Sequence, residues 1–171
     1  MGFLGAIKTC YSKSFTFSGR ASLSEYWWFV LFQFLVGIAI SAGAMSYFFA
    51  NPQILLQLKQ DGTLPAGFMN NLWIFSAAHF LLLFMPGLSA MVRRLHDTDR
   101  SGWWIGGFYI VVAGLLGVVA VLLTSATYAG ETAVGLTMII FTLIGFGALI
   151  YSVTMIVFFC LRGTPGPNRF G

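Results

Sequence analysis

Four long stretches of the chain contain no charged side chain. They cover residues 26–58, 62–92, 101–130 and 132–161, and every Lys, Arg, Asp and Glu lies between or outside them. A hydrocarbon core about 30 Å thick needs about 20 apolar residues per helix, so each stretch is long enough for one membrane span. Because a span must satisfy its own backbone hydrogen bonds, the sequence predicts an all-α integral membrane protein with four helices.

The composition excludes an ordinary soluble domain. Only 8% of the residues are charged and 58% are hydrophobic, whereas a soluble domain carries about 25% charged residues. We expect a single domain over residues 1–171. We further expect a four-helix bundle with spans near residues 26–50, 72–92, 103–124 and 136–161.

The basic residues predict the orientation of the chain. When the spans alternate in direction, eight of the nine Lys and Arg residues lie on one side and only Lys59 lies on the other. Basic residues are retained in the cytoplasm during membrane insertion. Both termini are therefore predicted to be cytoplasmic.

The amino-terminal arm carries a helical pattern of its own. Phe3, Ile7 and Tyr11 recur at helical spacing, and Lys8 and Lys13 lie elsewhere on the helix. A short amphipathic helix lying on the inner leaflet fits this pattern.

The start of the first span is marked by a capping box. Ser22 and Glu25 have the required spacing and precede the apolar run, so the helix is predicted to begin near Leu23. Trp27 and Trp28 follow at the level expected for the lipid headgroups. Tryptophans also stand at the starts of the second and third spans (Trp73; Trp103 and Trp104).

Two polar side chains fall within the predicted spans. Gln33 is near the inner end of the first span, and His79 is near the outer end of the second. An ionisable residue inside a membrane is a candidate for function, although a neutral histidine can also simply bond to a neighbouring helix.

The candidate site lies in three polar segments predicted to share the cytoplasmic face. They lead into the first span, join the second span to the third, and follow the fourth. Arginine side chains bind carboxylate and phosphate groups through two parallel hydrogen bonds, which makes these segments suitable for binding. The candidate residues are Arg20, Glu25, Arg93, Arg94, His96, Asp97, Asp99, Arg100, Asn168 and Arg169.

These residues allow three interpretations. In the first, Asp97 and Asp99 pair internally with arginines from the other segments (Arg20, Arg94 or Arg169). In the second, arginines that remain unpaired bind an anionic lipid headgroup or a protein partner. In the third, Arg93 and Arg94 only set the topology, and the remaining residues cap turns and the third helix (Asp97, Asp99 and Ser101).

Five sequence elements within these segments resemble the bacterial family known as domain of unknown function 805. They are FSGR at 17–20, EYW at 25–27, RRLHD at 93–97, RSGW at 100–103 and GPNRFG at 166–171. The resemblance covers nearly the whole chain. It implies a small multi-span protein of the bacterial cytoplasmic membrane without an established activity, and it supplies no catalytic residue.

We therefore expect a non-enzymatic scaffold or accessory subunit. Its expected partners are membrane lipids, including anionic headgroups, and a membrane protein or a second copy of the chain, but not nucleic acid. No cofactor or metal ion is expected. One alternative is an oligomeric transporter or channel component that uses Gln33 or His79. The other is an enzyme acting on a phosphate-bearing substrate, in which His96, Asp97 and Asp99 supply metal ligands or a general base beside phosphate-holding arginines.

Overall fold

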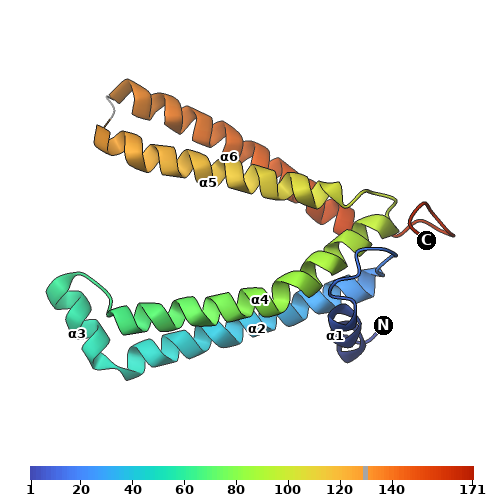
Figure 1. Ribbon diagram of the computed structural model, residues 1–171, viewed down its shortest axis with the longest axis horizontal. Coiled ribbons are helices and arrows are strands. Elements are labelled where there is room, and N and C mark those ends of the chain that lie inside the picture. The colour runs from blue at the N-terminus through green and yellow to red at the C-terminus, as the bar shows by residue number, and fades with distance from the viewer. Residues whose placement is uncertain (129–130) are drawn as a thin grey trace. The chain divides into compact units, whose positions relative to one another are not determined.

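The computed structural model of the protein describes residues 1–128 and 131–171. The regular elements in these ranges are all helices: α1 (Phe3–Ser12), α2 (Leu23–Ala50), α3 (Pro52–Asp61), α4 (Ala66–Asp97), α5 (Trp103–Tyr128) and α6 (Glu131–Cys160) (Figure 1). Among them, α2, α4, α5 and α6 are long and apolar enough to cross a membrane. The predicted all-helical class is confirmed, as is the prediction of four helices able to span a membrane.

The long helices extend beyond the predicted spans. Helix α2 begins at Leu23, as the capping box predicts. Helix α4 begins at Ala66, before the predicted span. Helix α5 continues to Tyr128, and α6 already begins at Glu131. The two helices therefore extend into residues 125–135, which lie between the predicted spans.

Helix α3 occupies the predicted outer connection between the first two spans. Pro52 stands in its first turn, where a missing N–H costs nothing. Gly62 ends the helix in the left-handed conformation, with φ 67°, and its N–H donates to the Leu58 carbonyl at 3.1 Å.

The chain divides into two compact units. The first contains Met1–Phe17 and Ser24–Ala90, and the second contains Ser18–Leu23 and Met91–Gly171. Figure 1 shows α2 and α4 side by side in the first unit, and α5 and α6 side by side in the second. The expectation of a single domain stays a prediction.

Helix α1 packs against the start of α2 through the face that the sequence suggested for lipid. The Phe3 ring meets Trp28 edge to face at 5.8 Å, and Tyr11 meets Phe29 at 6.0 Å. Cys10 is fully buried beneath this contact. The predicted helix therefore forms, but its Phe3 and Tyr11 side chains contact protein.

Helix α2 is tied to α4 next to a proline. Pro86 lies inside α4, and Gln33 Nε2 donates to the Leu83 carbonyl in the turn before it, at 3.2 Å. A Cβ at Gly87 would lie 2.7 Å from Gln33 Nε2. Glycine at this position leaves room for the amide, and a larger residue would require the end of the Gln33 side chain to shift.

Replacing Gln33 with leucine should reduce the free energy of unfolding by about 1 kcal/mol, because hydrogen bonds between membrane helices contribute this much or less. Unfolding by sodium dodecyl sulfate in detergent micelles measures the change. Phe34→Leu is the matched control, since Phe34 is exposed on the same helix. Equal stability of the wild type and Gln33→Leu would contradict the assignment.

Candidate functional site

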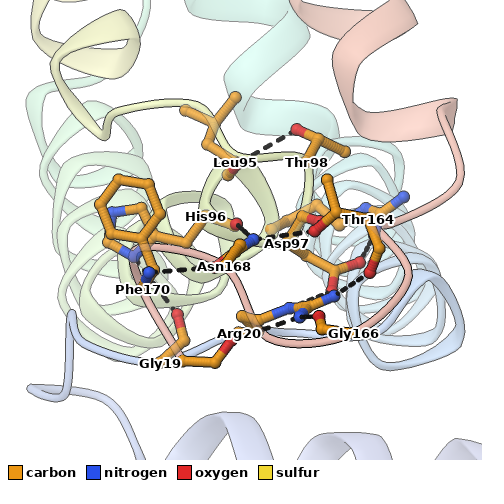
Figure 2. A network of polar contacts seen from close by, with 12 residues as sticks. Gly19, Arg20, Leu95, His96, Asp97, Thr98, Thr164, Gly166, Asn168 and Phe170 are labelled. Atoms are coloured by element: carbon orange, nitrogen blue, oxygen red, sulfur yellow. Dashed lines mark hydrogen bonds and ion pairs between the residues drawn. The ribbon is translucent and has the colours of Figure 1, made fainter.

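Three segments of the second unit meet around Asp97. They are the arm at Ser18–Leu23, the end of α4 with the loop that follows it, and the tail after α6. Figure 2 shows the arm and tail residues gathered on both sides of Asp97. The term polar cluster is used below for Arg20, Arg94, His96, Asp97 and Asn168.

Both oxygens of the Asp97 carboxylate accept hydrogen bonds from arginines. Arg20 Nε donates to Oδ1 at 2.8 Å, and Arg94 Nη1 donates to Oδ2. The Asp97 side chain is 13% exposed, and the Arg94 side chain is fully buried. Such charge-assisted bonds are stronger than neutral ones. The predicted internal pairing of Asp97 is confirmed.

Arg94 also connects the ends of α4 and α6. Its Nε donates to the Phe159 carbonyl at 3.1 Å, and its Nη2 donates to the Leu161 carbonyl. The last carbonyls of a helix lack partners within the helix, and a cation near them is favourable. Arg94 therefore caps α6 from the neighbouring helix.

Arg20 holds the tail against the arm. Its Nη2 donates to the Thr164 carbonyl at 2.7 Å, and its Nη1 donates to the Gly166 carbonyl at 2.6 Å. Next to it, the Ala21 N–H donates to the Arg93 carbonyl at 3.0 Å. The Arg20 guanidinium group therefore links the arm to the tail and, through Asp97, to the end of α4.

His96 and Asn168 complete the polar cluster. His96 Nδ1 lies 3.2 Å from the Gly19 carbonyl, which can only accept, so Nδ1 carries a proton. The imidazole stacks on Phe170 with ring centroids 3.8 Å apart and planes 3° apart. Asn168 Nδ2 donates to the carbonyl of His96 and to Thr164 Oγ1, both at 2.9 Å.

An exposed edge lies beside the polar cluster and consists of Asp99, Arg162 and Arg169. Arg169 Nε pairs with Asp99 Oδ1 at 3.1 Å, and the two side chains are 60% and 47% exposed. Arg162 is exposed as well. The second predicted pairing, Asp99 with Arg169, is therefore present at the surface.

The other candidate residues have different surroundings. Arg93 is fully buried and does not face solvent. The Arg100 guanidinium lies over the Phe158 ring at 4.0 Å and donates to the Thr98 carbonyl at 3.1 Å. Glu25 is buried in the first unit, where Cys10 Sγ donates to it at 4.0 Å.

The intramembrane candidates also differ from each other. Gln33 forms the bond to α4 described above. His79 Nδ1 is buried, and it has no hydrogen-bond partner within residues 1–128 and 131–171. A neutral His79 is alternatively expected to form a hydrogen bond to a neighbouring helix. Within residues 1–128 and 131–171, Nδ1 forms no such bond.

Sequence reasoning missed the backbone of the tail. Thr164 and Gly166 supply acceptors to Arg20 through their carbonyls, which no side-chain pattern reveals. Gly163 was missed too: a Cβ there would lie 2.6 Å from Asp97 Cγ. The glycines of the tail were the available signal, because glycine permits such close approach.

The geometry favours a structural role for the polar cluster. A general base needs a lone pair directed at a substrate, whereas both Asp97 oxygens receive arginine hydrogen bonds. The His96 ring is covered on one face by Phe170. The cluster is suited to holding three segments of the chain in fixed positions.

Comparisons with known proteins agree with the sequence elements. The family described as "Protein of unknown function (DUF805)" matches residues 14–171. "Inner membrane protein YhaI" of Escherichia coli K12 is 30% identical over 155 residues, covering 91% of this chain and 82% of YhaI. "Inner membrane protein YhaH" is 30% identical over 159 residues, covering 91% and 84%. No solved structure matches significantly.

Proposed function

We propose that this chain, which belongs to the DUF805 family of proteins of unknown function, is a non-enzymatic scaffold or accessory subunit of the bacterial inner membrane. The names of the two relatives support this location. The excess of basic residues on one side supports cytoplasmic termini. In this orientation the polar cluster faces the cytoplasm.

The observation that carries the proposal is the burial of Arg94 against Asp97 and the carbonyls at the end of α6. Burying an arginine is costly unless its charge and donors are satisfied. Here those groups are used to fix the chain, which favours a rigid platform over a catalytic centre.

The exposed edge supports a protein partner. It presents the Asp99 carboxylate beside the guanidinium groups of Arg162 and Arg169. An anionic headgroup without a cationic nitrogen complements only the two arginines, whereas a protein surface can complement both signs. Charged groups at the rim of an interface select partners and steer association.

Reversing two charges of the edge tests this proposal. In the double variant Arg162→Glu and Arg169→Glu, we expect retention of a protein partner to fall at least tenfold. The measurement is native mass spectrometry after gentle extraction from the native membrane. Stability should change little, because an exposed ion pair contributes about 0–1 kcal/mol.

Lys59→Glu is the control. Lys59 is exposed on α3, outside the edge, and its reversal should leave partner retention unchanged. Wild-type protein that carries no protein partner, or a partner retained by the double variant, would contradict the proposal.

A further inference from the structure

The exposed side chains of α1 and of the turn that follows it include both apolar and basic residues. Leu4 and Phe15 are each 78% exposed, and both lie outside the four helices that could cross a membrane. Lys8 and Lys13 are exposed on the same segment. The term arm surface is used below for these four residues.

The turn that carries Phe15 is held in place. Ser89 Oγ lies 2.6 Å from the Lys13 carbonyl oxygen and 2.8 Å from that of Thr16. Ser89 itself is fully buried in α4. The exposure of Phe15 therefore belongs to a fixed turn and not to a loose chain end.

The contacts of α1 place the arm surface at the membrane boundary. Helix α1 meets α2 at Glu25 through Cys10 and at Trp28 through Phe3. Glu25 is charged, whereas the apolar run begins directly after it. Tryptophan concentrates where headgroups meet hydrocarbon, so this level of α2 corresponds to the headgroup region.

We propose that the arm surface is a docking site for anionic phospholipid. Leu4 and Phe15 insert below the headgroups, and Lys8 and Lys13 contact the lipid phosphates. Apolar residues combined with lysines are the composition that binds an anionic leaflet. The site lies on other residues than the exposed edge, and only its assignment to the inner leaflet rests on the proposed orientation.

Spin labels on the full-length protein in phospholipid vesicles test the insertion. Cys160, the exposed cysteine, is replaced by serine, and Cys10 is retained because it is fully buried. Labels at Leu4→Cys and Phe15→Cys should be more accessible to oxygen than to a water-soluble nickel complex. Leu81→Cys and Pro167→Cys supply references for an exposed span residue and for the tail. Labels at both arm positions that match the Pro167 reference would overturn the proposal.

The charge requirement is tested by lipid retention from vesicles of phosphatidylcholine with a minority of phosphatidylglycerol. The preference for phosphatidylglycerol should fall about fivefold per lysine in Lys8→Gln and Lys13→Gln. Lys8→Arg and Lys13→Arg should keep it, as should the control Lys59→Gln. An unchanged preference in the glutamine variants would overturn the proposal. The edge residues Arg162 and Arg169 are intact throughout, so this failure is distinct from loss of a protein partner.

Discussion

Replacing Asp97 with alanine should lower the free energy of unfolding by about 3–5 kcal/mol, because it removes a carboxylate that is paired with a buried arginine. Arg94 is fully buried, and Asp97 accepts its Nη1 as well as Arg20 Nε. Arg94 also donates to the Phe159 and Leu161 carbonyls, and a carbonyl group carries no full charge. The large effect follows from the loss of a carboxylate that two arginines share, one of them fully buried.

Unfolding by sodium dodecyl sulfate in micelles measures this loss, and Arg169→Gln is the matched control. Arg169 also pairs with an aspartate, but its side chain is 60% exposed, so its replacement should cost about 0–1 kcal/mol. Equal losses for Asp97→Ala and Arg169→Gln would show that burial does not govern the contribution of these pairs.

Replacing Gly163 with alanine should cost about 1–3 kcal/mol through overpacking. The added Cβ would lie 2.6 Å from Asp97 Cγ and 2.8 Å from Oδ1. The carboxylate cannot move away without losing its arginine hydrogen bonds. The tail cannot easily move either, since the Thr164 N–H donates to the Asp97 carbonyl at 2.8 Å.

A double-mutant cycle identifies the cause of that cost. Once Asp97 is alanine, the methyl group at position 163 no longer meets a carboxylate, so Gly163→Ala should add little further destabilisation. Gly147→Ala is the control, because a Cβ at Gly147 meets nothing within 4 Å. Additive losses at positions 97 and 163 would contradict the clash.

The long-range architecture could be predicted because membrane spans leave a direct record in the sequence. Charge-free stretches locate the four long helices, and Ser22 with Glu25 locates the start of α2 at Leu23. The first signal arises because lipid requires apolar side chains, and the second because a helix cap involves residues close in sequence. Neither depends on which distant segments contact each other.

The site could be predicted only in part. The arginine and aspartate residues indicate that ion pairs form. That both Arg20 and Arg94 pair with Asp97 depends on the tertiary structure. Every residue has a backbone carbonyl group, so the sequence does not indicate which carbonyls of the tail accept hydrogen bonds from Arg20. Periodicity shows that Phe3 and Tyr11 lie near one side of α1, but it does not show that both rings contact α2.

The order of synthesis limits when Arg20 can reach its final contacts. Arg20 is synthesised before any of the four long helices, whereas its carbonyl partners at Thr164 and Gly166 are made only after α6. Arg94 likewise waits for Phe159 and Leu161. A nascent chain that stops before α6 therefore displays these arginines with those acceptors missing, and completion of the last helix is what closes the second unit.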